Sequence, residues 1–303
     1  MKFKCNNFVA LYFASCNLIM FFMNKKYILS PIVLLLLIVI YFKFEMPKKR
    51  VSQKIDKVYV INLDKDKARW KKVKSDLDKQ GITNYERFSA VWGLDIKFRS
   101  EDGKTFTGQA LKDKKVIFRI GEKYKVMCPN VTFTYEYDPS IERRRLRAGE
   151  FGCICSHLEV MNKIIDNKEI AMVLEDDVLM VDNFKYEVDF LMKNSMKEKN
   201  WDIIFLALRN TGATKAEKFF KMPTVVSHPH ISRLKDFTPS RAYIANGYSA
   251  GNILAKHNIY TAIDDHFTYL VQKFKDIKIY YFNHLDMQDS YAFGSIINEM
   301  DAR

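Results

Sequence analysis

Three consecutive acidic residues, Glu175, Asp176 and Asp177, directly follow an apolar run at residues 170–174. Such a run is typical of a buried strand, and carboxylates at the end of a buried strand are costly unless something binds them. If the strand continues, Glu175 and Asp177 share one side of it and Asp176 takes the other. Two oxygen donors on one side suit Mg²⁺ or Mn²⁺, and these cations bind diphosphates. A polar turn that caps the following helix is the alternative interpretation.

The segment 149–157, GEFGCICSH, offers a second set of candidate residues. Its two glycines lie three residues apart and would let a ligand approach the backbone closely, with Glu150 or His157 directed into the site. The alternative is the start of a helix that carries a hydrogen-bonded histidine. The segment alone leaves both interpretations open.

Polar residues also surround the end of the first apolar run of the folded part. Asn62, Asp64 and Arg69 could bind a nucleotide base or ribose there, or they could form a helix N-cap and a solvated helix face. A basic run before Gly149 could contact phosphate, although a charge run is usually a solvated face. Its members are Arg143, Arg144, Arg145 and Arg147.

The elements that must position these residues follow from the periodicity of the apolar side chains. Residues 57–63 predict a strand, and residues 85–91 predict a second one. Between them, Asp64 is a candidate N-cap for a helix that runs to Gln80 and ends at Gly81. Strand, helix and strand at this spacing are typical of a βαβ unit in a parallel sheet.

Residues 95–147 alternate polar turns with short strands at 115–120 and 131–137, which predicts an antiparallel insertion. Loops dominate 209–240, and the tail after residue 283 is irregular. The other predicted elements are helices at 149–167, at about 184–197, from about 249 and at 264–274, and strands at 170–174, 201–206, 242–245 and 277–282. The sequence therefore predicts an α/β domain with a mixed sheet. Ligands of such sheets bind beyond the carboxyl ends of the strands, where the acidic triplet lies.

The N-terminal part contains 16 uncharged, mostly apolar residues at 27–42, flanked by lysines. This length is just below what a spanning helix needs, and flanking lysines can extend it. We expect a transmembrane signal anchor at 27–44. The N-terminal segment 1–26 before it is either cytosolic or an extra segment, most of which is not translated if the true start is Met23. A linker, 45–56, leads to the main domain, 57–303. A cleaved signal peptide is the alternative.

This arrangement predicts a single-pass membrane protein and leaves the side of the membrane open. Basic residues after the apolar run favour a cytosolic domain, but the bias nearly vanishes if the lysines near Met1 are counted. In a eukaryotic host the domain could face the lumen of the endoplasmic reticulum or Golgi apparatus, and in a bacterium the anchor would lie in the inner membrane.

Composition bounds the remaining possibilities. The 303 residues are 48% hydrophobic and 28% charged, which is typical of a folded protein. The net charge is +13, but residues 1–50 carry +7 of it, so we expect no nucleic-acid partner. The five cysteines have no zinc spacing, and Cys153 and Cys155 are too close in sequence to bridge comfortably. We therefore expect no disulfide framework.

Four blocks in a fixed order resemble those of glycosyltransferase family 25, which includes bacterial lipooligosaccharide galactosyltransferases and collagen hydroxylysine galactosyltransferases. They are VYVINLDKDKARWKKV (58–73), AGEFGCICSHLEVMNKI (148–164), AMVLEDDV (171–178) and, more weakly, RAYIANGYSAGNIL (241–254). The resemblance covers roughly residues 57–265. The variable insert 95–147 lies outside these blocks.

The resemblance implies a GT-A-like, Rossmann-type nucleotide-sugar transferase that inverts the anomeric carbon. The donor would be UDP-galactose or UDP-glucose, the metal Mn²⁺ or Mg²⁺, and the acceptor a hydroxyl of a glycan or glycoprotein. By position, Glu175 and Asp177 would hold the metal. The UDP-sugar would be bound by residues of the first three blocks, namely Asn62, Arg69, Ser156, His157, Glu175 and Asp176.

In a single displacement, a carboxylate takes the proton of the attacking hydroxyl while the metal neutralises charge on the leaving diphosphate. Glu150, Asp264 and Asp265 are the candidate bases, and the sequence does not rank them. A membrane-anchored glycan- or nucleotide-binding protein of the same fold, without activity, is the alternative. The intact acidic triplet favours the enzyme.

Overall fold

The computed structural model describes residues 54–142, 144–195, 200–206, 231–233, 241–251, 253 and 258–282. The predicted segments 1–26 and 27–44 lie outside these residues, as does most of the predicted linker. Among the described residues, the structure contains no helix with the length and apolar character needed to cross a membrane. The anchor therefore stays a prediction.

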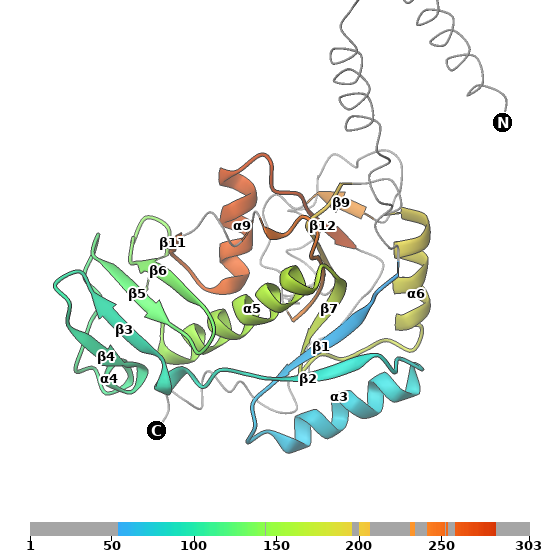
Figure 1. The fold of residues 1–303 in the computed structure, drawn as a ribbon, viewed down its shortest axis with the longest axis horizontal. Coiled ribbons are helices and arrows are strands. Elements are labelled where there is room, and N and C mark those ends of the chain that lie inside the picture. The colour runs from blue at the N-terminus through green and yellow to red at the C-terminus, as the bar shows by residue number, and fades with distance from the viewer. Residues whose placement is uncertain are drawn as a thin grey trace, which may run out of the picture. The chain divides into compact units, whose positions relative to one another are not determined.

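A seven-stranded mixed sheet forms the larger part of the described fold (Figure 1). In spatial order its strands are β2 (Tyr85–Ser89), β1 (Lys57–Asn62), β7 (Ile170–Glu175), β10 (Ala242–Asn246), β8 (Ile203–Phe205), β12 (Ile279–Phe282) and β9 (Ile231–Arg233). β1 is parallel to both β2 and β7, whereas β10 is antiparallel to β7 and β8. β12 is parallel to β8 and antiparallel to β9. The predicted mixed sheet is confirmed.

The predicted βαβ unit is present as β1, α3 (Lys67–Lys79) and β2. Val73 and Leu77 of α3 are buried. Asp64 is not the N-cap, because the helix begins three residues later and Asp66 occupies that position. One carboxylate oxygen of Asp64 instead accepts hydrogen bonds from Arg87 (2.6 Å) and Ser89 (2.9 Å) of β2.

The long helix α5 (Ala148–Asn167) lies across one face of this sheet (Figure 1). Tyr59 and Ile61 of β1 and Val173 of β7 join the apolar cluster that also contains side chains of α5. The alternate residues, such as Val60 and Leu174, are equally buried but lie outside that cluster. Because successive strand residues point to opposite faces, both faces of the sheet are covered.

The remaining helices agree with the sequence prediction in place, with small differences in length. The helix predicted at 184–197 is α6 (Phe184–Phe190), continued by a π-helical turn at Leu191–Ser195. The helix predicted at 264–274 is α9 (Ile263–Lys273). The helix predicted from about 249, the loop-rich stretch 209–240 and the tail after 283 lie wholly or mostly outside the described residues.

The insert 95–147 forms most of a second sheet and is largely antiparallel, as predicted. In spatial order the strands are β11 (Asn258–Ile259), β6 (Thr132–Glu136), β5 (Lys123–Met127), β3 (Lys97–Ser100) and β4 (Thr105–Thr107). β11 comes from the later part of the chain and runs parallel to β6. A 3₁₀ turn (Gly93–Asp95) precedes the sheet, and a short helix, α4 (Gly108–Lys112), follows β4.

The strand predicted at 115–120 is wrong. This segment makes one isolated bridge, between Ile120 and Tyr137. Its backbone is bonded by side chains instead of a neighbouring strand, because Arg145 donates to the Phe118 carbonyl and the Arg119 amide donates to the Tyr124 hydroxyl. The segment therefore buries Phe118 without pairing.

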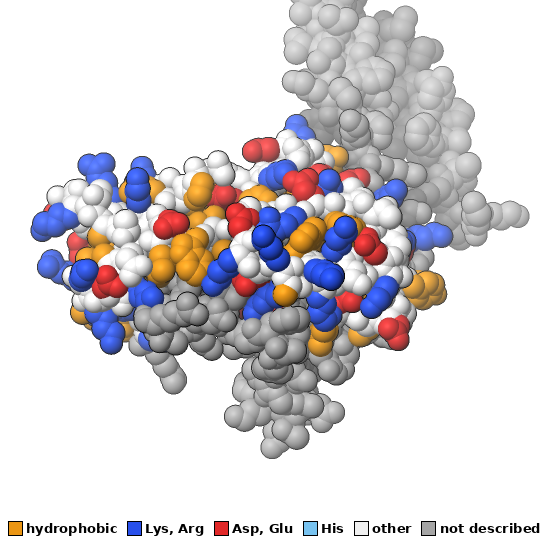
Figure 2. All heavy atoms as spheres, turned by 90° about the horizontal axis from the view of Figure 1, so that it is seen from below, with side chains coloured by type: hydrophobic (Ala, Val, Ile, Leu, Met, Phe, Trp, Pro, Cys, Tyr) orange, Lys and Arg blue, Asp and Glu red, His pale blue; other side chains and the backbone are white. Residues whose placement is uncertain are grey.

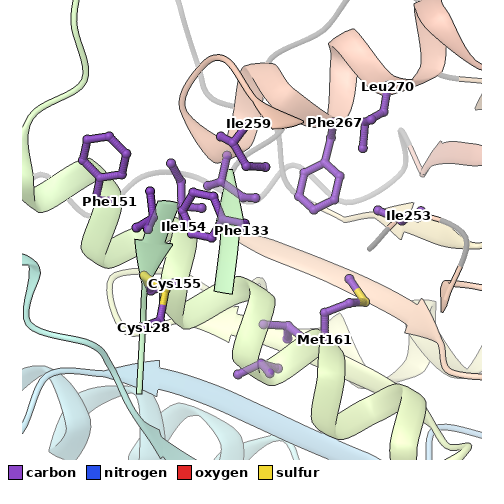
Figure 3. Packing of buried hydrophobic residues seen from close by; sticks show 14 of the residues in the cluster. Cys128, Phe133, Phe151, Ile154, Cys155, Met161, Ile253, Ile259, Phe267 and Leu270 are labelled. Atoms are coloured by element: carbon purple, nitrogen blue, oxygen red, sulfur yellow. A yellow bond between two sulfur atoms is a disulfide. The ribbon is translucent and has the colours of Figure 1, made fainter. Parts of the chain in front are cut away.

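Cys128 and Cys155 form a disulfide, with Cα atoms 5.7 Å apart (Figure 3). The expectation that the cysteines remain unpaired is wrong at this pair. The fold brings the end of β5 against α5, so two cysteines 27 residues apart in sequence meet in the core. Figure 3 shows the bridge beside Phe133, Phe151 and Ile154 in the same apolar cluster. It joins the insert to the helix that lies across the larger sheet.

Charged side chains are mixed on the surface. On the face drawn in Figure 2, Lys and Arg lie interspersed with Asp and Glu. Three i,i+3 or i,i+4 pairs on helices contribute to this mixing, among them Lys72 with Asp76 and Lys185 with Asp189.

Candidate active site

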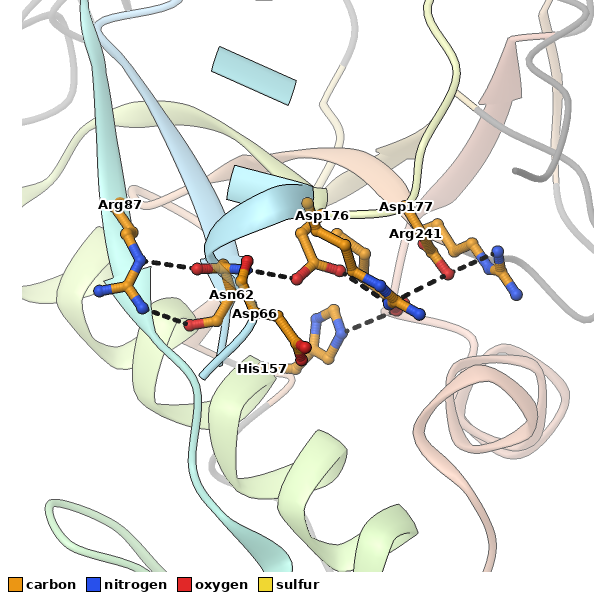
Figure 4. Close-up of polar contacts among 9 residues, drawn as sticks. Asn62, Asp66, Arg87, His157, Asp176, Asp177 and Arg241 are labelled. Atoms are coloured by element: carbon orange, nitrogen blue, oxygen red, sulfur yellow. Dashed lines mark hydrogen bonds and ion pairs between the residues drawn. The ribbon is translucent and has the colours of Figure 1, made fainter. Parts of the chain in front are cut away.

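A cleft opens where the carboxyl ends of β1 and β7 meet the first turns of α5. This is the edge at which ligands of α/β sheets bind. Among the residues predicted from the sequence, the structure brings six to the wall of this cleft: Arg69, Ser156, His157, Glu175, Asp176 and Asp177. Figure 4 shows the polar contacts around Asp176 and Asp177, which extend to Asn62, Arg87 and Arg241.

Asp176 is the buried centre of that network. One carboxylate oxygen accepts a hydrogen bond from the Asn62 amide (2.6 Å), and the other accepts one from the Arg69 guanidinium (3.1 Å). Burial raises the pKa of Asp176, although Asn62 and Arg69 act in the opposite direction. Asn62 is itself held by Arg87, which donates to its side-chain oxygen (2.7 Å). Asp176 therefore fixes Arg69 at the cleft wall and Asn62 next to it.

Asp177 has a different environment. Its Oδ2 pairs with Arg241 at 2.8 Å and lies 3.9 Å from Arg69, while its Oδ1 is buried and has no hydrogen-bond partner in the described part of the chain. Burial, and then the charges of Glu175 and Asp176, raise the pKa of Asp177 to about 7. A buried carboxylate oxygen without a partner is costly, which indicates that a cation or proton belongs there.

Arg241 was not predicted as a functional residue. It lies just before β10 with a φ of 42°, a left-handed conformation that is uncommon for residues other than glycine. Its carbonyl accepts a hydrogen bond from the Glu175 amide (2.7 Å), and its guanidinium pairs with Asp177. Both ends of Arg241 thus contact the acidic triplet. The signal in the sequence was its position as the first residue of the fourth family block.

His157 and Glu175 face each other at the cleft wall, with His157 Nε2 3.3 Å from Glu175 Oε1. The other ring nitrogen of His157 lies 3.0 Å from the hydroxyl of Tyr243, which is buried in β10. Burial raises the pKa of Glu175, but the hydrogen bond to His157 and the charges of His157, Arg241 and Arg69 outweigh it and lower that pKa overall. Glu175 is therefore a carboxylate at neutral pH, beside an Asp177 that is only partly ionised.

Ser156 and Gly152 connect α5 to the loop before the insert. The Ser156 hydroxyl accepts a hydrogen bond from the Val91 amide (2.8 Å) and donates to the Gly152 carbonyl (2.7 Å). A Cβ on Gly152 would lie 2.7 Å from the Val91 carbonyl oxygen. The close backbone approach expected at this glycine is thus made by the chain itself. Gly149, the other glycine, lines the cleft.

Glu150 is buried at the start of α5, and it is absent from the residues that line the cleft. Both of its oxygens are engaged, because Arg144 donates to each of them and the Arg147 amide donates to Oε2 (2.8 Å). Burial raises the pKa of Glu150, but these hydrogen bonds and the arginine charges lower it overall. Its contacts hold the beginning of α5 and the preceding arginines together.

Asp264 and Asp265 lie in the first turn of α9. Asp265 is exposed, whereas Asp264 is half-buried. After burial and the charge of Glu175, the charge of Asp264 contributes to raising the pKa values of Cys153 and Tyr243. Like Glu150, neither Asp264 nor Asp265 is among the described residues that line the cleft.

Residues 55–281 match the sequence profile of glycosyltransferase family 25 (LPS biosynthesis protein). A glycosyltransferase 25 family member of Aedes aegypti is 26% identical over 53% of this chain and 22% of its own length. Procollagen galactosyltransferase 1 of Danio rerio is 26% identical over 57% of the chain and 25% of its own length. A probable inactive glycosyltransferase 25 family member 3 of Rattus norvegicus is 26% identical over 59% of the chain and 27% of its own length.

The matches thus span about a quarter of the length of these relatives. The family match includes the strand ends and helix start that form the cleft, together with Arg241. The family resemblance of the sequence blocks is confirmed by this match, and the chain belongs to glycosyltransferase family 25.

Proposed function

We propose that this protein is an inverting glycosyltransferase that moves a hexose, most simply galactose, from a UDP-sugar to a hydroxyl of a glycan or glycoprotein. The observation that carries the proposal is Asp177, which lines the cleft together with Glu175 and whose buried Oδ1 has no hydrogen-bond partner among the described residues. Membership of the family supports transferase chemistry. The name of the zebrafish relative supports galactose as the sugar.

Glu175 and Asp177 would hold Mn²⁺ or Mg²⁺. Their carboxylates are the hard donors that such cations bind, and the Asp177 oxygen without a partner fits one. When bound, the cation neutralises charge that develops on the leaving diphosphate. Asp176 would not be a ligand, because Asn62 and Arg69 already engage both of its oxygens.

The chain's own residues would do the remaining work. Arg69 and Arg241 place two positive charges at the cleft wall, where they attract a diphosphate and stabilise its departure. Their guanidinium groups are oriented by Asp176 and Asp177, so they need little reorganisation on binding. Asn62 keeps Asp176 in position to do this.

Among the three candidate bases, we favour Asp264 as the group that accepts the proton of the acceptor hydroxyl. Neither carboxylate lines the cleft, and the charges of both act on Cys153 at its wall. We favour Asp264 over Glu150 because the Glu150 oxygens hold Arg144 and the Arg147 backbone at the start of α5. Asp265, exposed on the next position of α9, offers a matched control. Asp264→Asn should lower the turnover number by about 10²-fold or more and Asp265→Asn by less than about threefold.

The direct test is UDP release by the purified full-length chain. Candidate donors are UDP-galactose and UDP-glucose, each with and without EDTA and with Mn²⁺ restored. We expect release only with the cation, and a loss of at least about 10²-fold in Asp177→Asn. Full activity of that variant, or equal release in EDTA, would overturn the proposed metal role.

A second candidate is a binding protein of the same fold without transferase activity. The observation in its favour is that relatives from Rattus norvegicus and Homo sapiens are named inactive. In that case calorimetry would detect UDP-sugar binding, while no donor would give UDP above the uncatalysed rate.

We also propose that residues 27–44 anchor the protein in a membrane. The full-length chain should then sediment with membranes and resist carbonate extraction. Recovery of the full-length chain in the soluble fraction would contradict the anchor.

A further inference from the structure

Cys153, His157 and Glu175 form a second cluster of metal-ligating side chains beside the proposed oxygen site. One potential ligand atom from each residue, the Cys153 thiol sulfur among them, lies within 4.8 Å of the other two. Cys153 is a free, partly exposed thiol, while Cys128 and Cys155 are consumed by their disulfide. The sequence predicts no zinc site, because the five cysteines have no zinc spacing, and the approach of Glu175 to Cys153 and His157 becomes visible only in the fold.

The local structure explains why these three side chains meet. Cys153 and His157 are four residues apart on α5, so they lie one above the other on the same helix face. Glu175 is the last residue of β7, which packs against α5. All three line the cleft, so a cation can enter and water can complete its coordination.

The distances suit a tetrahedral ion. Bond lengths of about 2.0 to 2.3 Å to nitrogen, oxygen and sulfur place neighbouring ligand atoms about 3.3 to 3.7 Å apart. His157 Nε2 and Glu175 Oε1 are already 3.3 Å apart. The Cys153 sulfur needs an approach of about 1 Å or less, which a small rotation of a half-exposed side chain provides.

His157 is oriented for this role. Its Nδ1 lies 3.0 Å from the Tyr243 hydroxyl, which leaves Nε2 facing Glu175 and the cleft. Metal-bound histidines commonly use their second ring nitrogen for such a hydrogen bond, which fixes the ring and the coordinating nitrogen. Arg69 and Arg241 pair with Asp176 and Asp177.

We propose that Cys153, His157 and Glu175 bind a thiophilic divalent cation, with Zn²⁺ as the best fit, and that this cation inhibits the protein. The sulfur and imidazole ligands select Zn²⁺ over Mn²⁺ or Mg²⁺. Because Glu175 belongs to both sites, occupation of one prevents full occupation of the other. The inhibition, unlike the binding, rests on the proposed transferase function.

Binding is tested with Co²⁺, which replaces Zn²⁺ and absorbs in the near ultraviolet only when a thiolate coordinates it. The tag-free full-length chain should show this absorption and lose it when Zn²⁺ is added. Cys153→Ser should abolish it and weaken Zn²⁺ binding by about 10-fold to 100-fold. Asp177→Asn is the matched control, because it disables the proposed oxygen site and should keep the cobalt–thiolate absorption.

Cys153→Ala, checked for native near-ultraviolet circular dichroism, repeats the test if the serine variant does not fold. The proposal is overturned if the wild-type chain lacks the absorption, if either Cys153 variant retains it, or if Asp177→Asn loses it while folded.

Inhibition is tested separately, as Zn²⁺ titrations of UDP release at several Mn²⁺ concentrations. Each variant is compared with its own uninhibited rate. The wild-type protein should show inhibition that Mn²⁺ relieves, and Cys153→Ser should need at least about 10-fold more Zn²⁺. Zn²⁺ inhibition that is equal in both would overturn the inhibitory role. If UDP release is absent altogether, the proposed function fails, and the cobalt experiment still decides the metal site.

Discussion

The cleft and the insert differ in what their side chains bury: the cleft buries charged groups, and the insert buries aromatic rings. At the cleft, three carboxylates, two arginines and a histidine are crowded at the end of β7, and one buried oxygen, Asp177 Oδ1, has no partner. In the insert, rings pack on rings: Phe118 lies 4.8 Å from both Tyr124 and Tyr135, measured between ring centroids. The disulfide Cys128–Cys155 then ties the insert to α5.

This contrast indicates where stability and chemistry reside. Buried charges that are not fully compensated lower stability and are retained where a ligand can use them. Packed aromatic rings and a disulfide raise stability and carry no reactive group. Helix α5 belongs to both regions, because it contributes Phe151 to the aromatic cluster and His157 to the cleft. The rigid insert can thus hold the first turns of α5 against the charge repulsion at the cleft.

The largest effect is expected in the insert, for Phe118→Ala. Phe118 is buried and touches five other rings, so its removal leaves a cavity. The free energy of unfolding should fall by about 3 to 5 kcal/mol in urea denaturation. Ile117→Ala is the control, because Ile117 is 60% exposed, and it should change stability by less than about 0.5 kcal/mol. Equal effects of the two variants would refute the role of the cluster.

At the cleft, in contrast to the insert, we expect a buried group to lower the stability of the fold, and to do so in a way that depends on pH. The pKa of Asp177 is raised to about 7 in the folded protein, so the folded state binds a proton that the unfolded state has already released. The contribution of Asp177 to the stability of the metal-free protein should therefore fall as pH rises from about 4 to about 7.

The shift of about three units in the pKa of Asp177 corresponds to a change of at most about 4 kcal/mol in the free energy of unfolding. Glu175 has a lowered pKa and contributes with the opposite sign, so the comparison must be made with Asp177→Asn. The unfolding free energy of the wild-type protein minus that of the variant should decrease over this pH range. A difference that is constant with pH would show that Asp177 is ionised throughout.

Much of the framework of the cleft was predictable from the sequence, because periodicity and strand ends are local signals. The βαβ unit, the strand before the acidic triplet and the helix over 149–167 follow from apolar spacing alone, within one or two residues. Asn62, Arg69 and Asp176 were predicted together as donor-binding residues from the family resemblance, and the structure places them at or after the ends of the adjacent parallel strands β1 and β7. Order and spacing of the sequence blocks then identified the family.

What could not be predicted depends on contacts between distant segments. Asp64 resembles an N-cap by type, but Arg87 and Ser89, on the neighbouring strand, take its carboxylate. Residues 115–120 have the composition of a strand, yet Arg145 and Tyr124 bond their backbone. The Cys128–Cys155 bridge and the cluster of Cys153 with His157 and Glu175 require knowledge of what α5 packs against. Helical spacing alone could have paired Cys153 with His157.

The disulfide should contribute less to the free energy of unfolding than the aromatic cluster around Phe118. Its loss in Cys128→Ala/Cys155→Ala should lower the free energy of unfolding by about 2 to 4 kcal/mol, since it closes a loop of 27 residues. UDP affinity, measured under conditions where the protein is folded, should stay within about twofold. Reduction of the wild-type protein should give a similar loss of stability, and reduction of the double variant should give none. A stability loss in the double variant on adding reductant would show that the effect is not the bridge.

The smallest effect is expected for a conservative change in the cleft, Arg69→Lys. Arg69 Nη1 lies 3.1 Å from Asp176 Oδ1 and 3.9 Å from Asp177 Oδ2, and a lysine keeps the charge but loses the planar guanidinium that can bind a phosphate through two nitrogens. If Arg69 helps to bind the diphosphate, calorimetry should show UDP affinity weaker by about 10-fold, with the fold intact.

Arg87→Lys is the matched control, because Arg87 belongs to the same network through Asn62 but does not line the cleft. It should weaken UDP binding by less than about threefold. Equal losses in both variants would mean that the arginines act only by positioning Asn62 and Asp176, and unchanged affinity in Arg69→Lys would leave Arg69 without a direct role in donor binding.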